Sequence, residues 1–353
     1  MNIREAIKRV TSAEDLDKAE MIDVMRDIMT GETTDAQNAA FLVGLQMKGV
    51  KADEILGGAT VMRELSTKVN VEPSPHLVDT CGTGGSGSNK FNVSTASAIV
   101  AACAGAKVAK HGNRGATSKS GSADVLEAAG VKLDASPNVI AKAIEQVGVG
   151  FMFAAAHHSA MKHVITARKE IGVRTVFNLL GPLTNPAGAP NQIIGVFDPA
   201  WIVPLLEVLK DLGSEHVLIV SAEDGLDEIS ISAKTHVGEL KAGEISSYTV
   251  SPSDFPIAEY DNYHMLQIET AEESLVMLRD ALAGRNSAAA DIVALNAGAA
   301  IYAANLTEDL VSGVSRAKEI LQSGLAVEKL DELVQFTQAA AEKGKRRDEI
   351  DYS

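Results

Sequence analysis

A glycine-rich loop carries the clearest chemical signal in this sequence. Residues 82–87 read Gly-Thr-Gly-Gly-Ser-Gly and lie between a predicted strand, 77–81, and a predicted helix, 93–104. Glycines at such a junction let backbone amides approach a phosphate, and the start of the following helix adds a positive dipole end. A tight turn commonly needs one or two glycines, whereas four in six residues favour a phosphate-binding loop.

The same loop matches the G-x-G-x-x-G fingerprint of dinucleotide sites, but its surroundings do not. That site needs an acidic residue about twenty positions later to hold the ribose hydroxyls. Here the corresponding segment, 107–111, reads Lys-Val-Ala-Lys-His and is basic, and Ser88 stands where a P-loop needs lysine. We therefore favour a ligand with several phosphate groups, and an NADP-dependent oxidoreductase is the alternative.

Local charge agrees with a polyanionic ligand. Between residues 79 and 122 the chain has five basic side chains and one acid, Asp79, giving a local charge of +4 within a chain of −15. Positive loops at strand ends attract anionic small molecules. A solvated basic surface is the alternative interpretation.

A carboxylate cluster follows the predicted strand 216–221. It comprises Glu223, Asp224, Asp227 and Glu228. Mg²⁺ prefers oxygen ligands and is typically held by one or two carboxylates together with substrate phosphates. By itself the cluster would be a solvated acidic loop, but in a chain with a phosphate loop it predicts a magnesium site.

Arg168 occupies an unusual position in the predicted helix 159–171. It lies seven residues after Met161, four after Val164 and three before Ile171, so helical spacing places it on their apolar face. An arginine on such a face forms either a buried ion pair or a binding site for an anion. Spacing does not distinguish the two.

The elements that position these residues fall into two regions. Residues 1–70 show helical patterns only, including 16–29, a capping box at 34–37 before the apolar run 39–47, and 53–65. After a proline-rich boundary at 71–75, predicted strands (77–81, 107–110, 149–154, 193–197, 216–221) alternate with helices such as 202–212. This alternation predicts a mostly parallel sheet in an α/β fold. The last third is mostly helical, with helices at 271–282, 288–304 and 310–321.

Composition narrows the class of protein. The chain has 353 residues, 46% hydrophobic and 4% aromatic. Its acidity and lack of aromatic stacking platforms argue against nucleic acid and anionic membranes as partners. Neither the spacing of Cys81 and Cys103 nor that of His157, His158 and His163 predicts a zinc site or disulfide framework. With no secretory signal and no membrane span in the sequence, we expect a soluble, cytoplasmic enzyme of small molecules.

Four segments together resemble the anthranilate phosphoribosyltransferase family. They are CGTGGSGSNKFNVSTAS from Cys81, KHGNRGATSKSGSADVLEAAGV from Lys110, HHSAMKHVITARKEIGVRTVFNLLGPLTNP from His157 and GLDEIS from Gly225. Their order and spacing also match, and the resemblance extends over essentially the whole chain. Pyrimidine nucleoside phosphorylases are similar in fold and glycine-rich loop, but lack the KHGNR segment.

The resemblance implies a fold, an activity and site residues. It implies a homodimer with a helical N-terminal domain, 1–70 joined by part of 155–185, and a larger α/β domain, 71–353, with a mostly parallel central sheet. The activity would be transfer of phosphoribose from phosphoribosyl pyrophosphate (PRPP) to the anthranilate amine in tryptophan biosynthesis, with two Mg²⁺ per active site and no acid–base residue. PRPP would contact Gly82, Gly85, Ser86, Lys90, Asn92, Val93, Ser94, Thr95, Lys110, His111, Gly112, Asn113, Arg114, Gly115, Ala116, Thr117, Ser118 and Ser122. Anthranilate would contact Gly82, Asn113, Arg168, His111 and Pro182, and the metals would be held by Ser94, Asp227 and Glu228.

Two positions depart from the family pattern. Ser86 stands where members usually carry aspartate, and Lys90 where they usually carry threonine. The loop's backbone contacts are independent of the first change, while Lys90 adds a cation that faces either the phosphates or solvent. Two further alternatives for the function are transfer to a different aromatic amine and a noncatalytic relative of the same fold that binds nucleic acid.

Overall fold

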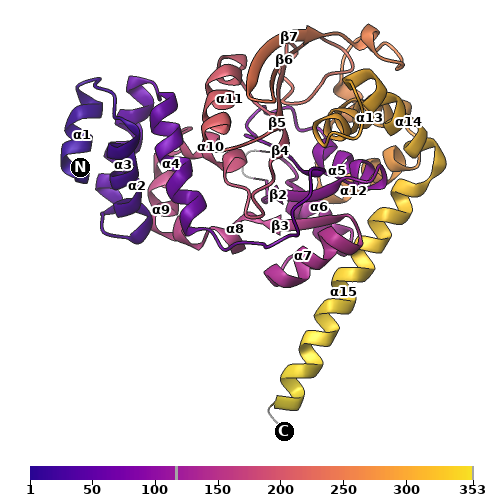
Figure 1. The fold of residues 1–353 in the computed structure, drawn as a ribbon, viewed down its shortest axis with the longest axis horizontal. Helices are drawn as coiled ribbons and strands as arrows, with labels where there is room; N and C mark the ends of the chain where they lie inside the picture. The colour runs from indigo at the N-terminus through magenta and orange to yellow at the C-terminus, as the bar shows by residue number, and fades with distance from the viewer. Residues whose placement is uncertain (116–117, 352–353) are drawn as a thin grey trace.

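Four helices form the N-terminal part of the protein. The computed structural model describes residues 1–115 and 118–351. Helices α1 (Ile3–Thr11), α2 (Lys18–Thr30), α3 (Asp35–Lys48) and α4 (Ala52–Leu65) cluster on the left in Figure 1. Capping boxes at Asp17 and Thr34 begin α2 and α3, and Gly31 ends α2 with a φ of 85°. The helices predicted from the sequence are thus confirmed within two residues at most ends.

A seven-stranded sheet lies at the centre of the rest of the chain. Its strands are β1 (Leu77–Gly82), β2 (Lys107–Gly112), β3 (Val149–Phe153), β4 (Asn191–Gly195), β5 (His216–Ala222), β6 (Thr235–Lys241) and β7 (Glu244–Val250), in the order β3-β2-β1-β4-β5-β6-β7. The first five are parallel, and β6 and β7 are antiparallel. The sequence predicted the five parallel strands but not the antiparallel pair.

Helices cover both faces of the sheet, as Figure 1 shows. In β5, Leu218 and Val220 join the core that contains α5 (Val93–Cys103) and α13 (Ser287–Ala303), while Val217 and Ile219 join the core of the N-terminal helices and α11 (Ile202–Asp211). Burial on both faces explains why the parallel strands are almost continuously apolar. The N-terminal helices therefore pack through one shared core with the sheet.

The remaining helices complete the two layers and the C-terminus. They are α6 (Ser122–Ala128), α7 (Pro137–Gln146), α8 (Ala154–His157), α9 (Ile165–Ile171), α10 (Phe177–Leu180), α12 (Ala271–Leu282), α14 (Leu310–Ser323) and α15 (Leu325–Asp351). The end of α15 extends away from the body in Figure 1, and the sequence did not predict this helix as a separate element. Among the described helices, none is both long and apolar enough to cross a membrane.

The strand order creates a switch point between β1 and β4. From β1 the chain moves outward to β2 and β3, and it then returns to the other side of β1 as β4 and β5. In open parallel sheets ligands bind at the carboxyl ends of strands beside such a reversal. The glycine-rich loop begins directly at the carboxyl end of β1, so the topology places it at the expected binding edge.

Candidate active site

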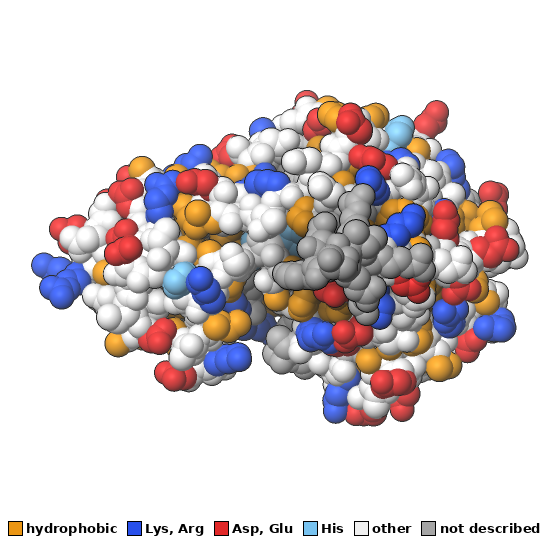
Figure 2. Space-filling view, turned by 90° about the horizontal axis from the view of Figure 1, so that it is seen from below, with side chains coloured by type: hydrophobic (Ala, Val, Ile, Leu, Met, Phe, Trp, Pro, Cys, Tyr) orange, Lys and Arg blue, Asp and Glu red, His pale blue; other side chains and the backbone are white. Residues whose placement is uncertain are grey.

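An open cavity of about 640 Å³ lies at the carboxyl ends of the parallel strands. The sequence-predicted site residues that line it are Gly82, Gly85, Ser86, Lys90, Asn92, Val93, Ser94, Lys110, His111, Gly112, Asn113, Arg114, Gly115, Ser118, Ser122, Arg168, Pro182, Asp227 and Glu228. Met62 of α4 also lines the wall, so the N-terminal helices contribute to it. On the face shown in Figure 2 the surface is hollowed between these helices and the rest of the molecule, and acidic and basic side chains are interspersed.

Three predicted residues are not placed in this cavity. The Thr95 side chain is buried in α5, where its hydroxyl has no hydrogen-bond partner among the described residues, and it does not line the cavity. The first turn of α5 directs Thr95 inward, so its contact with PRPP stays a prediction. Ala116 and Thr117 lie outside the described residues.

The glycine-rich loop is held at its start and in its middle. At the start, the Thr83 amide donates to the Gly195 carbonyl over 2.9 Å, which ties the loop to β4. In the middle, Arg174 donates from Nη2 to the Gly85 carbonyl over 2.6 Å, and its guanidinium lies 4.1 Å from the centre of the Phe197 ring. Gly85 has a φ of 83°, a conformation in which other residues are strained. These contacts therefore hold the backbone of the loop in a defined position.

Asn92 joins this loop to the next one. Its Oδ1 accepts from the hydroxyls of Ser120 (2.8 Å) and Ser274 (2.7 Å), and its Nδ2 donates to the Ser120 carbonyl over 3.2 Å. These bonds use most of the hydrogen-bonding groups of the Asn92 side chain. Asn92 therefore holds the loops that surround the cavity in fixed relative positions. Ser120 was not predicted, although it belongs to the segment quoted for the family resemblance.

The basic segment formed by the end of β2 and the loop after it contains one buried cation and one that is already paired. Lys110 donates to the Thr80 carbonyl over 2.5 Å, and its Nζ lies 3.3 Å from the Ser94 hydroxyl oxygen. Burial lowers the pKa of Lys110, although Asp79 opposes the shift. Arg114 instead points to α6, where its Nη1 lies 3.0 Å from Asp124 and 2.7 Å from Glu127. Positive charge is therefore concentrated at Lys110.

Only two of the four acidic residues after β5 reach the cavity. Asp224 accepts hydrogen bonds from the hydroxyls of Ser230 (2.6 Å) and Ser232 (2.9 Å), so it shapes the turn, and Glu223 is exposed. Asp227 and Glu228 line the cavity, in agreement with their selection from the sequence.

Lys90 lies on this carboxylate pair. Its Nζ is 2.6 Å from Asp227 Oδ1 and 3.8 Å from Glu228 Oε1. Burial acts against both charges, but the attraction raises the pKa of Lys90 and lowers that of Asp227. Burial raises the pKa of Glu228 to about 7, and Lys90 only partly offsets it. From the sequence we expected Lys90 to face either the phosphates or solvent. In the structure it lies against the predicted metal ligands instead.

The cavity is also lined by an arginine and two histidines. The Arg168 guanidinium lies 5.2 Å from the centre of the Phe177 ring, has no carboxylate partner among the described residues, and has its pKa lowered by burial. The rings of His111 and His158 are 5.1 Å apart. Burial, reinforced by neighbouring cations and histidines, lowers their pKa values to about 3 and about 4. Both imidazoles are therefore neutral at pH 7.

The segment around Arg168 differs from the expected single helix. Residues Ser159–His163 form a 3₁₀ helix, Val164 breaks the regular geometry with a φ of −128°, and α9 begins at Ile165. Ile165 is 43% exposed, so the predicted apolar face is not continuous. The prediction of one continuous helix over 159–171 is therefore wrong, whereas Arg168 is partly buried and lines the cavity.

Among the cavity residues that the sequence analysis did not select are His158, Arg174 and Phe177. His158 was considered only as a metal ligand, and it directly precedes the predicted helix 159–171. Arg174 and Phe177 belong to the RTVF segment, but nothing in their spacing indicates which loop they contact.

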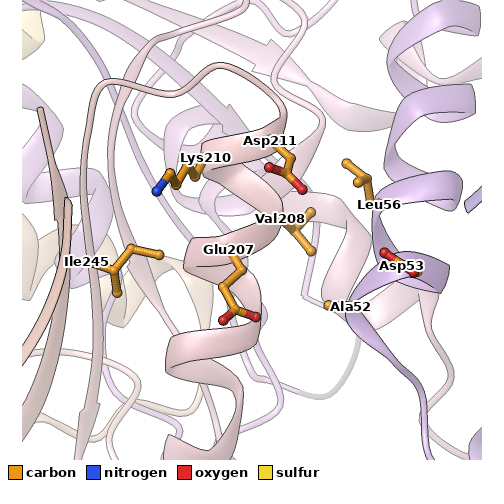
Figure 3. A pocket seen from close by; sticks show the side chains of 8 residues that line it. All are labelled: Ala52, Asp53, Leu56, Glu207, Val208, Lys210, Asp211 and Ile245. Atoms are coloured by element: carbon orange, nitrogen blue, oxygen red, sulfur yellow. The ribbon is translucent and has the colours of Figure 1, made fainter. Parts of the chain in front are cut away.

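A second hollow of about 380 Å³ lies between α4, α11 and β7 (Figure 3). It contains none of the predicted site residues. Its acidic side chains Asp53, Glu207 and Asp211 point to different sides in Figure 3, and the described residues form no cluster of three or more side chains suited to a metal. The predicted site residues are therefore gathered at the larger cavity.

The fold and the cavity define a transferase class with a helical bundle beside an α/β domain. Residues 4–66 match the helical bundle domain of a glycosyl transferase family, and residues 74–327 match its a/b domain. Relatives from Teredinibacter turnerae and Saccharophagus degradans, both named anthranilate phosphoribosyltransferase, are 56% and 57% identical over 341 residues, covering 96% of this chain and 99% of each relative. The chain belongs to the anthranilate phosphoribosyltransferase family.

Solved structures agree with this assignment. The Thermus thermophilus anthranilate phosphoribosyltransferase has a TM-score of 0.89 and 43% identity, covering 94% of this chain and 99% of its own. The Saccharomyces cerevisiae enzyme in complex with PRPP and Mg has a TM-score of 0.85 and 26% identity, covering 96% of this chain and 98% of its own. The predicted fold class, a helical N-terminal part with a larger, mostly parallel α/β part, is confirmed.

Proposed function

We propose that this chain transfers the phosphoribosyl group of PRPP to the amine of anthranilate, releasing pyrophosphate, in tryptophan biosynthesis. Family membership supports the reaction class. The observation that carries the proposal is the set of groups that line one cavity. The glycine-rich loop, Lys110 and the carboxylates line it together with Arg168, which has no carboxylate partner among the described residues, and with the neutral pair His111 and His158.

Each of these two sets of groups suits one substrate. Backbone amides of the loop after β1 and the Lys110 ammonium would hold PRPP phosphates. Arg168 would offer two donors to the anthranilate carboxylate, and Pro182 with the two imidazoles would enclose the ring. Asn113 and Gly82 also line this cavity and would contact the same substrate.

The reaction does not demand a strong base. The aromatic amine is mostly neutral at pH 7, and its nitrogen forms the new bond to the ribosyl carbon as the carbon–oxygen bond to pyrophosphate breaks. The amine proton is released, and the bonding pair leaves with pyrophosphate. Positioning and stabilisation of the departing charge by Lys110 and the loop amides would supply the rate enhancement. A closed cavity would exclude water as a competing acceptor.

Mg²⁺ is the proposed metal. Carboxylate and hydroxyl oxygens suit this cation, which would neutralise charge on the departing pyrophosphate. Ser94 and Glu228 are the donors that fit one ion. The resemblance implies two ions per site, but Lys90 already contacts Asp227, so the donor set suits a second ion poorly.

The assembly and location are proposed on the same family grounds. We propose a homodimer, a functional division into 1–70 with part of 155–185 and 71–353, and a cytoplasmic location suited to amino-acid biosynthesis. The helical part contacts α9 and α10, which supports including segment 155–185 with it. Light scattering after size-exclusion chromatography would measure the mass of the assembly.

The fluorescence of anthranilate gives a direct test. Mixing the protein with anthranilate, PRPP and Mg²⁺ should cause a rapid loss of fluorescence, and a chelator should prevent it. If PRPP binds by calorimetry without any loss, the acceptor is a different amine. If neither binding nor loss occurs, the proposal is wrong. Binding of NADPH would favour the oxidoreductase alternative.

A further inference from the structure

Lys90 is fixed against the carboxylate pair rather than placed freely in the cavity. The Lys90, Asp227 and Glu228 side chains are 10%, 10% and 12% exposed. The Lys90 backbone forms a β-bridge with Gln267, whose side-chain amide donates to the Ser88 carbonyl over 3.0 Å. Gln267 therefore holds the backbone of Lys90 and of the loop before it in place.

The ammonium occupies the space in which a cation would be attracted to these acids. A charged group 2.6 Å from Asp227 Oδ1 uses that oxygen as a hydrogen-bond acceptor. A divalent ion on the same carboxylate would have to displace the ammonium or lie a few ångströms from it, and repulsion between like charges is strong in a poorly solvated site.

We infer that Lys90 is a resident counter-ion of Asp227 and Glu228 and takes the place of one divalent metal ion in the cavity. The inference rests on the proposed function in one respect: it takes pyrophosphate as the anion that lies next to Lys90. Lys90 then supplies positive charge to the departing group without a metal. Consequently, the chain binds fewer divalent ions than the same carboxylates would bind without the lysine.

Counting bound Mn²⁺ tests this directly. Mn²⁺ is a paramagnetic substitute for Mg²⁺ with a similar preference for oxygen ligands, and its electron paramagnetic resonance signal distinguishes free from bound ion. The measurement uses Mn²⁺ alone, without substrates. The Lys90→Met variant keeps the length of the side chain and removes its charge. We expect it to bind one more Mn²⁺ per chain, or to bind Mn²⁺ at least about tenfold more tightly, than the unmodified protein.

Three further variants make the result specific. Lys90→Arg, which keeps the charge, should bind Mn²⁺ as the unmodified protein does. Lys90→Met combined with Asp227→Asn should lose the gained site. Lys329→Met removes a lysine that lies 2.6 Å from Glu332, outside the cavity, and should leave the number of bound ions unchanged. Thermal melting checks that each variant is folded.

Equal Mn²⁺ binding by the unmodified protein and the Lys90→Met variant would overturn the inference, as would a gain that Asp227→Asn does not remove. The anthranilate assay separates this from the proposed function. A gained Mn²⁺ site in a protein with no transferase activity would support the counter-ion role and reject the reaction. Activity with equal Mn²⁺ binding would do the reverse.

Discussion

Arg168 and Lys90 are two cations in one cavity with opposite surroundings. Lys90 has its charge balanced by Asp227 and Glu228, whereas Arg168 faces an aromatic ring and lacks a carboxylate partner among the described residues. An unbalanced, partly buried guanidinium is suited to binding a planar carboxylate. Of the two interpretations that spacing left open for Arg168, the structure favours the anion site over the buried ion pair.

Replacing Arg168 should therefore affect binding of the acceptor. Arg168→Ala removes a charge-assisted contact worth about 1.5–3 kcal/mol, so we expect the KM for anthranilate to rise roughly tenfold to a hundredfold. The KM for PRPP should change little. Steady-state kinetics with each substrate varied would measure both. Lys169→Ala, which changes the exposed neighbour of Arg168, is the control, and an unchanged anthranilate KM in Arg168→Ala would reject the assignment.

The neutral histidines should make folding stability depend on pH. The pKa of His158 is lowered from its ordinary value of 6.5 to about 4, so between these values the unfolded chain binds the proton and the folded chain does not. Stability contributed by this residue is therefore present above pH 6.5 and is lost as the pH falls, by about 1.4 kcal/mol per pH unit. Urea unfolding at pH 7.5, 6 and 5 would show a smaller decline for His158→Gln. Parallel pH profiles for the two proteins would contradict this origin.

At the scale of elements, short segments set the position of the site residues. The break at Val164 separates the 3₁₀ turn from α9, and the end of α2 packs against this turn. Gly31, which ends α2, has no room for a side chain: a Cβ there would lie 2.6 Å from His163 Nδ1. Asn38 of α3 also donates to the His163 carbonyl over 3.1 Å. The N-terminal helices thus support the segment that carries Arg168.

Two constraints act on Gly31: its left-handed backbone conformation and its close contact with His163. A pair of glycine variants distinguishes their effects on stability. Gly31 and Gly324 both end helices in left-handed geometry, with φ of 85° and 80°, but a Cβ at Gly324 would meet nothing within 4 Å. Gly324→Ala should lower the free energy of unfolding by about 1 kcal/mol, the cost of this backbone conformation. Gly31→Ala should lower it by about 2 kcal/mol, because His163 must also move. Urea denaturation measures both, and equal losses would show that His163 moves freely.

On the scale of the whole molecule, contacts between the two layers form the cavity. Arg63 of α4 donates from Nε to the Leu183 carbonyl (2.6 Å) and from Nη1 to the Leu212 carbonyl (3.2 Å). These bonds join the N-terminal helices to the segment after α10 and to the end of α11. Because the cavity lies between the same layers, its shape depends on this packing as well as on the loops.

The sequence by itself determined the local elements and the chemistry of the main loops. Helix caps, periodicity and glycine positions act over a few residues, so α2, α3, α12 and the five parallel strands were predictable. The choice of Asp227 and Glu228 came from the family resemblance instead, whereas the glycine-rich loop and the basic segment were visible at the ends of predicted strands. These features depend on backbone conformation and residue type, which neighbouring residues largely decide.

Only the tertiary structure decided which side chains meet. Lys90 and Asp227 are 137 residues apart, and Arg174 and Gly85 are 89 apart, so no local pattern indicates either contact. The antiparallel pair β6–β7, the break before α9 and the inward direction of Thr95 also depend on packing against distant elements. Burial in a shared core sets these arrangements, and the same burial shifts the pKa values of Glu228, His111 and His158.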